Sequence, residues 1–338
     1  MEIVTKNNKM RMMKKKLIVM LMLVGMAMTA MGQQIAVVFE GGSMRTCSTL
    51  LQAVRNATDG SVIYLPAGGF QIGDTVRIKH RVSIIGLNHK TKSENADGMT
   101  SISGNLYFDE GSSGSVVMGC YISGNVMIGY DDKAVHNIFV RYCNINSIQV
   151  RSNLCTGTTV NQCYIRNCSI FNNAEATMTH NVMHSVDHLC GGIINNNIIT
   201  SRPSNATLYC VYNSTICNNI ILDSSYIHYG GDCQIANNMT LNTTWGDNPV
   251  KVEADSWNDV FENPVPGISS NASYHFKEDF TDNESKVGLY AGKSPSSIKY
   301  FHDDALPPVP YVQAKEVPGS TNFDGKLNVT LTVKDGNK

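Results

Sequence analysis

The sequence predicts an all-β protein whose short strands form the stacked coils of a parallel β-helix. A short cap helix precedes the coils, and an irregular cap and tail follow them. Charged residues make up only 16% of the chain, while Asn, Ser, Thr and Gly are plentiful, as is typical of turn-rich β proteins. Two asparagines followed by apolar residues recur as "NNNIIT", "CNNIIL" and "ANNMTL". Self-similarity at a period of about 20 residues indicates a solenoid with one coil per repeat.

The N-terminus has the order of a secretory signal peptide. The basic stretch "KNNKMRMMKKK" precedes twelve apolar residues, "LIVMLMLVGMAM", and small residues follow at Ala30 and Gly32. Twelve residues are fewer than a membrane-spanning helix needs, and no later segment is longer. We expect residues 1–32 to be removed and the protein to be exported to the periplasm, the cell surface or the medium. An uncleaved membrane anchor is the alternative.

A cap helix is expected directly before the coils, because the open end of a solenoid must be covered. The segment "TLLQAVRNA", which begins at Thr49, puts Leu50, Leu51 and Val54 on one side of a short helix. Thr49 and Gln52 have the spacing of a capping box. A turn, "DG", and an apolar strand, "SVIYLPAG", follow it.

The repeat aligns on the second asparagine of each pair, and successive aligned positions lie 16 to 23 residues apart. These positions are Cys120, Cys143, Cys163, Asn181, Asn197, Asn219 and Asn238. Three positions earlier stand the apolar residues Val117, Val140, Val160, Met178, Ile194, Ile216 and Ile235. Two positions later stand Ile122, Ile145, Ile165, Met183, Ile199, Ile221 and Thr240. Leucine-rich repeats have a similar length, but their leucine frame is absent from this sequence.

Asparagine suits the sharp turn between two strands of one coil, because it tolerates a left-handed backbone better than other non-glycine residues. Coils stack about 4.8 Å apart, so equivalent asparagine side chains can hydrogen-bond to one another as a ladder. Cysteine at the same position in three consecutive coils favours a stack of buried thiols over disulfides. Disulfides remain an open alternative for Cys155, Cys168, Cys190, Cys210 and Cys233.

The stretch "STLLQAVRNATDGSVIYLPAGGFQIGDTVRIKHRVSIIGLN", residues 48–88, resembles the opening of the pectate-lyase-like superfamily of right-handed parallel β-helices. That opening consists of a cap helix, a "DGSVIYLPAG" strand and a "VSIIG" strand. The resemblance covers residues 48–245 and implies right-handed coils. Its motifs specify the fold well and the chemistry poorly. We expect residues 33–245 to hold the N-terminal cap and the β-helix.

Residues 246–338 differ from the coils, since prolines cluster there and the asparagine repeat stops. The segment "SKVGLYAGKSP" resembles the "D-I-G-x-Y-G-G" segment that closes many secreted β-helix proteins of Bacteroidetes, although its acidic residue is absent. "GKLNVTLTVK" alternates apolar and polar residues, as a half-buried strand does. We expect a C-terminal cap and a final strand, suited to surface attachment or self-association.

The chain carries 27 basic and 28 acidic side chains, which does not favour nucleic acid as a partner. Enzymes of the resembled superfamily cleave polysaccharides, the lyases with Ca²⁺ on clustered carboxylates and a Lys or Arg base, the hydrolases with paired carboxylates. The adjacent pair Asp131 and Asp132, with Arg141, is the candidate catalytic set. An exposed turn is the alternative interpretation of the pair. No cofactor is expected, except Ca²⁺ if the protein is a lyase.

Two further groups are candidates for binding. His184, Asp187 and His188 could hold a metal if the chain folds back, because a spacing of four residues on a strand is about 13 Å. Structural or surface histidines are the alternative. Arg141, Arg151 and Arg166 fall on neighbouring coils and could gather on one face to bind an acidic sugar. Tyr121 and Tyr164 occupy equivalent positions and could stack on sugar rings, with solvated arginines and core tyrosines as the alternatives.

The leading functional prediction is an exported, non-catalytic β-helix that binds carbohydrate or acts as an adhesive structural protein at the cell surface. The alternative is a polysaccharide lyase or glycoside hydrolase that acts on an acidic polysaccharide. The coils do not separate the two, because one fold can host either function.

Overall fold

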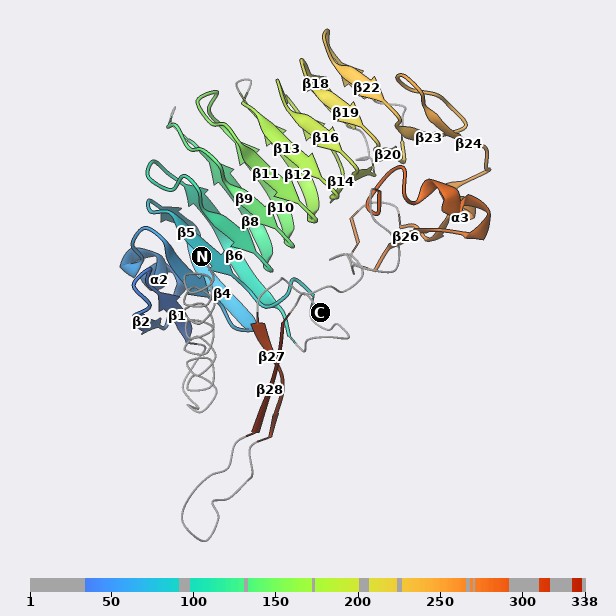
Figure 1. Ribbon diagram of the computed structural model, residues 1–338. Coiled ribbons are helices and arrows are strands. Elements are labelled where there is room, and N and C mark those ends of the chain that lie inside the picture. The colour runs from blue at the N-terminus through green and yellow to red at the C-terminus, as the bar shows by residue number, and fades with distance from the viewer. Residues whose placement is uncertain are drawn as a thin grey trace, which may run out of the picture.

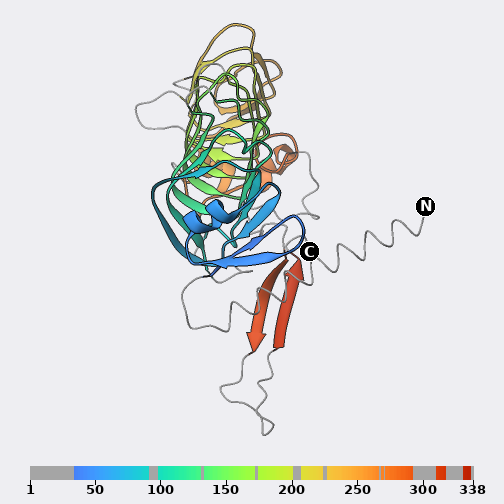
Figure 2. The same ribbon diagram turned by 90° about the vertical axis from the view of Figure 1, so that its left-hand side faces the viewer.

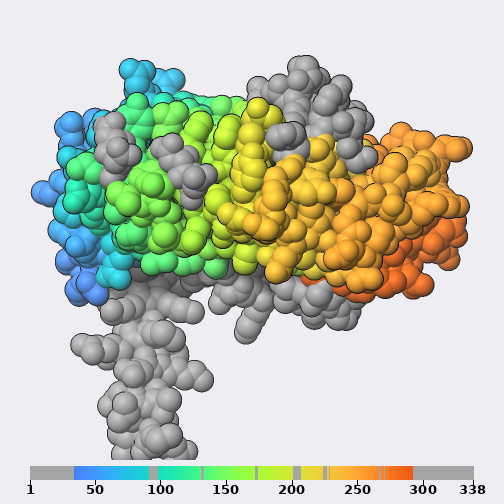
Figure 3. Space-filling model, turned by 90° about the horizontal axis from the view of Figure 1, so that it is seen from above, coloured from blue at the N-terminus to red at the C-terminus, as the bar shows by residue number. Residues whose placement is uncertain are grey.

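The computed structural model describes residues 34–90, 98–130, 133–171, 174–200, 207–223, 227–265, 268–269, 271–291, 310–316 and 330–335. Two long sheets wind into a parallel β-helix of about eight coils (Figure 1). Seen from above, the coils follow one another along a single rod (Figure 3). The predicted all-β, stacked-coil fold is therefore confirmed.

The 11-stranded sheet starts with two antiparallel strands, and nine parallel strands follow them. In spatial order the strands are β2 (Met44–Cys47), β1 (Ile35–Val38), β3 (Ser61–Tyr64), β5 (Val82–Ile85), β7 (Val116–Met118), β9 (Phe139–Arg141), β11 (Thr158–Asn161), β13 (Ala176–Thr179), β16 (Ile193–Asn195), β19 (Thr215–Cys217) and β22 (Gln234–Ala236). The antiparallel start turns the chain into the first coil.

The 13-stranded sheet is parallel throughout, and its strands divide into two short rows after β12, because β14 and β15 both pair with that strand. In chain order the strands are β4 (Gly68–Ile78), β6 (Thr100–Phe108), β8 (Tyr121–Ile128), β10 (Asn144–Val150), β12 (Tyr164–Ile170), β14 (Val182–Met183), β15 (Val186–Asp187), β17 (Ile198–Ile199), β18 (Leu208–Val211), β20 (Ile220–Ile221), β21 (Ile227–Tyr229), β23 (Met239–Leu241) and β24 (Val250–Val252). Since β24 pairs with β23, the coils extend past residue 245.

The core consists of stacked inward columns, one residue from each coil. In the 11-stranded sheet, Ile63 and Ile84 start a column that continues through the predicted residues from Val117 to Ile235. In the 13-stranded sheet, Phe70 and Ile102 start the column that continues from Ile122 to Thr240. All of these residues are buried. Both apolar positions of the repeat are therefore confirmed as core.

The turn between the two sheets uses a left-handed residue immediately before the ladder position. Among the seven aligned coils, this residue is glycine only in the first, where Gly119 (φ 70°) precedes Cys120. Later coils use Tyr142 (φ 52°), Gln162 (φ 53°), His180 (φ 55°), Asn196 (φ 58°), Asn218 (φ 55°) and Asn237 (φ 55°). The first asparagine of each pair therefore supplies the left-handed backbone, which asparagine adopts at low cost.

The second asparagine of each pair is buried and forms the predicted ladder. The side-chain amide of Asn181 donates to Oδ1 of Asn197, Asn197 donates to Asn219, and Asn219 donates to Asn238, each at 3.0 Å. Each of these Oδ1 atoms also accepts the backbone N–H of the preceding coil's asparagine, at 2.9 to 3.0 Å. The ladder thus gives each of these buried amides a hydrogen-bond partner, and a buried amide without a partner would destabilise the fold.

Cys120, Cys143 and Cys163 continue this column toward the N-terminus, and all three side chains are fully buried. The ladder reaches the thiols through the backbone N–H of Cys163, which donates to Oδ1 of Asn181 at 2.9 Å. Burial raises the pKa of the Cys120 and Cys163 thiols well above the usual value. All ten cysteines lie among the described residues and are free thiols, so the predicted thiol stack is confirmed.

The helix α2 (Leu50–Asn56) covers the N-terminal end of the coils, as Figure 2 shows in the view along the stack. Thr49 accepts a hydrogen bond from the Gln52 N–H, as the capping spacing predicts. Leu50, Ala53 and Val54 are buried. Leu51, expected on the same side, is instead 37% exposed, because the buried side follows the 50, 53, 54 spacing of a helix.

The outward residues that follow the ladder change from polar to apolar halfway along the 13-stranded sheet. The first coils place Ser101, Tyr121 and Asn144 there. Later coils place Tyr164, Val182, Ile198, Ile220 and Met239 there, and all five are buried. Their burial requires a further layer of chain on this half of the sheet.

That layer is the chain after the last coil. It contains α3 (Trp257–Val260), β25 (Phe261–Asn263), β26 (Ser273–Phe276) and the 3₁₀ helix η1 (Glu278–Asn283), and α3 and β26 lie beside the sheet in Figure 1. Its buried residues Val260, Phe261, Tyr274, Phe276, Val287 and Leu289 form one apolar cluster with the outward column. The C-terminal cap therefore packs against the side of the β-helix.

Gly288 fits this contact closely. Its N–H donates to the carbonyl of Asn218 at 2.8 Å, and its φ is 76°. A Cβ at this position would lie 2.4 Å from Cδ1 of Ile220, so only glycine fits. The segment that resembles the closing motif of secreted β-helices is thus docked on the later coils.

The strands β27 (Pro310–Glu316) and β28 (Thr330–Asp335) pair antiparallel as a hairpin that extends away from the coils in Figures 1 and 2. The predicted final strand is therefore present. Within the described part of the chain, the helices are all too short or too polar to cross a bilayer. The predicted signal peptide, residues 1–32, lies outside the described residues.

Replacing a ladder residue tests the stacking. We expect Asn197→Leu to lower the free energy of unfolding by roughly 1 to 3 kcal/mol, because the amides around it lose their partners. The control Asn153→Leu changes an exposed turn residue. Denaturant unfolding of both variants measures the difference. Equal stability of Asn197→Leu and the parent protein would contradict a role for the ladder.

Thiol reactivity tests the cysteine stack. Six cysteines are buried and four, Cys190, Cys210, Cys217 and Cys233, are partly exposed. A thiol reagent needs the thiolate, which burial disfavours. We expect a chromogenic disulfide reagent at neutral pH to react with these four in the native protein and with all ten only in denaturant. Fewer than ten reactive thiols in denaturant would indicate disulfides and contradict the stack.

Candidate functional site

Aromatic and cationic side chains form a row along the edge where the strands of the 13-stranded sheet end. We call this row the lateral ladder, and its members are Arg77, Tyr107, Tyr130, Arg151, Phe171, His188 and Tyr209. Arg77 and Tyr107 lie one residue before the ends of β4 and β6, whereas Tyr130, Arg151, Phe171 and His188 lie just after β8, β10, β12 and β15. Tyr209 lies within β18. Parallel stacking therefore brings residues of adjacent coils, 17 to 30 positions apart in the sequence, into one row.

The first half of the lateral ladder holds two tyrosine rings between two arginines. The Arg77 guanidinium lies 4.7 Å from the ring centroid of Tyr107. Tyr107 meets Tyr130 edge-on at 6.0 Å and donates its hydroxyl to the Tyr130 carbonyl at 3.1 Å. The guanidinium of Arg151 lies 5.1 Å from the Tyr130 ring, so cation–π attraction joins the coils at both ends of this segment.

The second half continues with rings. Arg151 also lies 5.2 Å from the ring of Phe171 and is thus held between two aromatic side chains. Phe171 stacks on His188 with 6.2 Å between the ring centroids, and His188 meets Tyr209 edge-on with 5.4 Å between the ring centroids. Each of these contacts joins one coil to the next, so the lateral ladder is continuous from Arg77 to Tyr209.

A second group of aromatic residues follows the lateral ladder in the last coils. Tyr229 meets Trp245 at 5.7 Å, and Tyr212 packs so closely on Gly230 that a Cβ there would lie 1.7 Å from its ring. Tyr209, Tyr212 and Tyr229 are 44%, 38% and 44% exposed. Tyr130, near the other end, is 40% exposed. Exposed rings at both ends of one edge can contact an extended ligand.

Charges near the lateral ladder are mixed. Arg77 pairs with Asp109 at 3.4 Å, and Lys133 pairs with Glu110 at 3.2 Å. The pKa of Tyr209 is raised above its usual value, mainly by a hydrogen bond with the Cys210 side chain. A tyrosine phenol is neutral at physiological pH, and this shift acts in the same direction. The surface offers rings, hydroxyls and guanidinium groups, one of them paired with a carboxylate, and these groups can contact sugar rings and hydroxyls.

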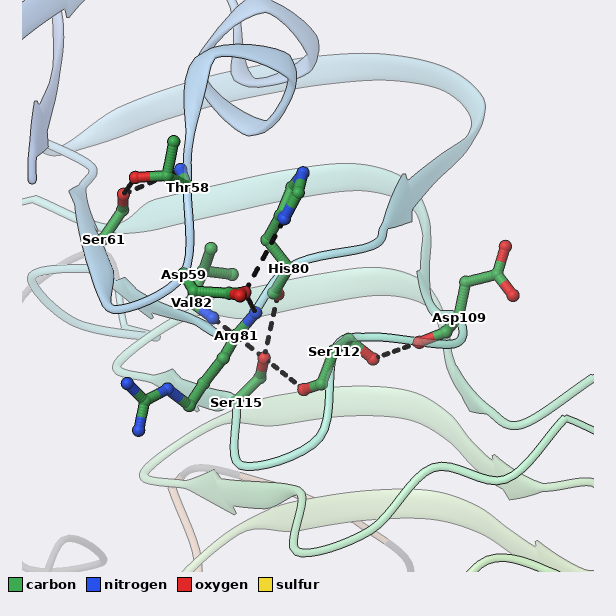
Figure 4. A network of polar contacts seen from close by, with 9 residues as sticks. All are labelled: Thr58, Asp59, Ser61, His80, Arg81, Val82, Asp109, Ser112 and Ser115. Atoms are coloured by element: carbon green, nitrogen blue, oxygen red, sulfur yellow. Dashed lines mark hydrogen bonds and ion pairs between the residues drawn. The ribbon is translucent and has the colours of Figure 1, made fainter.

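A polar network joins the turns of the first coils (Figure 4). The buried Ser115 hydroxyl accepts the N–H of Val82 at 3.0 Å and donates to the carbonyl of Ser112 at 2.6 Å. His80 lies 3.6 Å from Asp59, and both side chains are mostly exposed. Although Ser, His and Asp lie close together here, the Ser115 hydroxyl bonds to backbone groups. The network holds the turns rather than forming a nucleophilic site.

The candidate catalytic residues fall in different places. Asp131 and Asp132 lie outside the described residues. Arg141 is exposed at the end of β9, and its guanidinium lies 5.5 Å from the ring of Phe139. It belongs to the 11-stranded sheet, away from the lateral ladder.

The three arginines do not gather on one face, which corrects that expectation. Arg141 lies on the 11-stranded sheet, whereas Arg166 lies within β12 of the other sheet. Arg151 follows β10, whose last residue pairs with the last residue of β12. Arg166 is therefore several residues away from Arg151 along the strand direction. Only Arg151 joins the lateral ladder.

Tyr121 and Tyr164 share an outward column with Asn144 between them, so they are two coils apart. Tyr121 is half-buried. Tyr164 is 1% exposed, stacks on His89 at 5.4 Å and belongs to the cluster beneath the C-terminal chain. The core alternative therefore holds for Tyr164, and a ligand cannot reach its ring.

The metal candidates have other neighbours. The Nδ1 of His184 lies 2.9 Å from the Thr200 hydroxyl, and His188 lies between Phe171 and Tyr209 in the lateral ladder. Asp187 lies on β15, next to Ser169 and Tyr209 of the neighbouring coils. Among the described residues, no three His, Cys, Asp or Glu side chains converge as a metal site would require.

Most of the lateral ladder was missed by sequence reasoning, which singled out only Arg151 and His188 of its seven members. The available signal was an aromatic or cationic residue shortly after each apolar strand, as in "MIGYDD", "IQVRSN" and "CSIFNN". The residue type changes from coil to coil, so the row has no repeated letter to align.

Scans against protein-family models, curated proteins and solved structures found no match to this chain.

Replacing the central arginine tests the cohesion of the lateral ladder. We expect Arg151→Gln to lower the free energy of unfolding by roughly 1 to 2 kcal/mol, because two cation–π contacts are lost. The matched control Arg45→Gln removes an exposed arginine of β2. Thermal and denaturant unfolding measure both. A loss of the same size in the control would show that the effect is not specific to the lateral ladder.

Proposed function

We propose that this protein is an exported, non-catalytic β-helix scaffold that binds a carbohydrate polymer along its lateral ladder. The observation that carries the proposal is the continuous row of rings and guanidinium groups from Arg77 to Tyr209. Aromatic rings present an apolar face to the C–H face of a sugar, and guanidinium groups and tyrosine hydroxyls donate hydrogen bonds to sugar oxygens.

The repeat of the coils suits a polymer. Coils about 4.8 Å apart present contacts at a regular spacing along the rod, so a chain of repeated units can meet several of them at once. Each contact is weak, but linked contacts add through effective concentration. The exposed rings of Tyr130, Tyr209, Tyr212 and Tyr229 are the contacts that solvent, and therefore a ligand, reaches most easily.

The proposal includes the resemblance to the pectate-lyase-like superfamily and to secreted Bacteroidetes β-helix proteins. Its support is that α2, β3 and β5 fall within the segment 48–88 that carries the resemblance. Export rests on the signal-like residues 1–32. Attachment to the cell surface or self-association through the tail rests on the extended hairpin of β27 and β28.

Retention on glycans tests the proposed function. The exported protein is run through native gels that contain one polysaccharide each, from a panel of neutral and acidic polymers, with and without Ca²⁺. We expect retardation by at least one polymer. The double variant Tyr130→Ala/Tyr209→Ala should weaken that binding roughly tenfold, because two ring contacts of about 0.5 to 1.5 kcal/mol are lost.

Tyr121→Ala is the matched control, since it removes a half-buried tyrosine from the outward face of the same sheet. Its retardation should equal that of the parent protein. Reducing ends and unsaturated sugars are measured in parallel. Product formation that Asp132→Ala abolishes would replace the binding proposal with the enzyme alternative. Absence of retardation by every polymer would overturn carbohydrate binding.

A further inference from the structure

The outward side of the 11-stranded sheet forms a second surface, distinct from the lateral ladder. Over the nine parallel strands from β3 to β22, two outward residues per strand line up in two columns. The first column is Val62, Ser83, Val116, Phe139, Thr159, Thr177, Ile193, Thr215 and Gln234. The second is Tyr64, Ile85, Met118, Arg141, Asn161, Thr179, Asn195, Cys217 and Ala236. We call these 18 residues, two from each of nine strands, the neutral face.

The neutral face is accessible and almost uncharged. All of its residues are half-buried or exposed, and Ile193 is 42% exposed. Arg141 is the one charged residue among the 18. A scarcity of charged residues together with exposed apolar residues distinguishes the centre of a protein interface from ordinary surface.

Two asparagine side chains of the neutral face already bond to the next coil. The amide of Asn161 donates to the hydroxyl of Thr179 at 2.8 Å and to its carbonyl at 3.2 Å. Oδ1 of Asn195 accepts from the amide of Asn218 at 3.0 Å. Because these groups keep their partners, removing water from the face costs less than burying unbonded amides would.

We propose that the neutral face packs against the same face of a second copy of this chain. A two-fold axis parallel to the strands and passing over β11, the fifth of the nine strands, pairs each strand with its counterpart counted from the other end. Large residues then face small ones at three positions, where Phe139 meets Thr177, Tyr64 meets Ala236, and Ile85 meets Cys217. Val116 meets Ile193, which pairs two apolar side chains across the interface.

The small charge of the neutral face also favours a second copy of this chain as the partner. With this axis Arg141 meets Thr179 of the other copy, and the two Arg141 side chains lie two strand spacings apart along the rod, about 10 Å, before the separation of the sheets is added. At that distance their repulsion is largely screened at physiological salt. An acidic polymer or nucleic acid would need a row of cations, which these two columns do not contain.

The size of the neutral face sets the strength of the contact. Nine strands span about 38 Å, and two columns with their side chains are about 10 Å wide. The buried area is thus on the order of 400 Å² per copy, about half of a standard stable interface. We therefore infer a weak dimer that forms as the concentration rises, not an obligate one.

Sedimentation velocity over a concentration series tests this proposal on the full exported protein, from a few micromolar to several hundred micromolar. We expect the weight-average sedimentation coefficient to rise toward that of a dimer. Ile193→Lys and Thr177→Lys each place a charge in the middle of the face and should raise the dimer dissociation constant at least tenfold. Gln71→Lys, an exposed residue of β4 in the other sheet, is the matched control and should sediment as the parent does.

Circular dichroism confirms that each variant keeps its fold, and two variants on different strands guard against failure of one. A parent protein that stays monomeric at every concentration overturns the proposal. Self-association that both lysine variants leave unchanged also overturns it, because the contact then lies elsewhere, for example in the tail. Either result leaves carbohydrate binding by the lateral ladder untouched.

Discussion

The rest of the structure depends on the sharp turn that joins the two sheets within each coil. One residue there is left-handed, and the next is a buried cysteine or asparagine. The asparagines bond to their equivalents in the neighbouring coils, and the cysteine thiols donate to backbone carbonyls of their own coil. Since strands pair in parallel and the turn repeats, a shift by one residue in any coil would turn its core residues outward. The amide ladder thus specifies the register, and the register places every other side chain.

The same register creates the three outer surfaces. One outward column becomes apolar at Tyr164, and the C-terminal chain covers it from there on. The outward columns of the other sheet stay uncovered and nearly uncharged. At the strand ends, where turns vary in length, rings and guanidinium groups from seven coils contact one another in series. A solenoid therefore carries functional surfaces as rows, and a substitution in one coil changes one position of a row.

The sequence predicts the parts that repeat in identity. Inward apolar residues and ladder asparagines recur with the same chemistry, so their alignment yields both core columns and the thiol stack. The lateral ladder repeats only in approximate position, with Arg151 and Phe171 directly after their strands and Tyr130 one residue further, and no shared residue type marks it. The arginines were misplaced because Arg141 and Arg166 lie on different sheets, which only the pairing of strands reveals. The cover over this half of the sheet could have been inferred from the two adjacent aliphatics that follow the ladder asparagine in later coils, as in "NNIIL". One residue of each such pair must face outward, and only a further layer of chain can bury it.

Amide hydrogen exchange with and without an oligosaccharide of the retained polymer tests whether an extended ligand binds along the edge of the coils. Binding there should slow exchange around Tyr130, Arg151, Phe171 and Tyr209, in one row along the rod. Slower exchange confined to the outward face of the 11-stranded sheet, or to the surface around Tyr121, would contradict it.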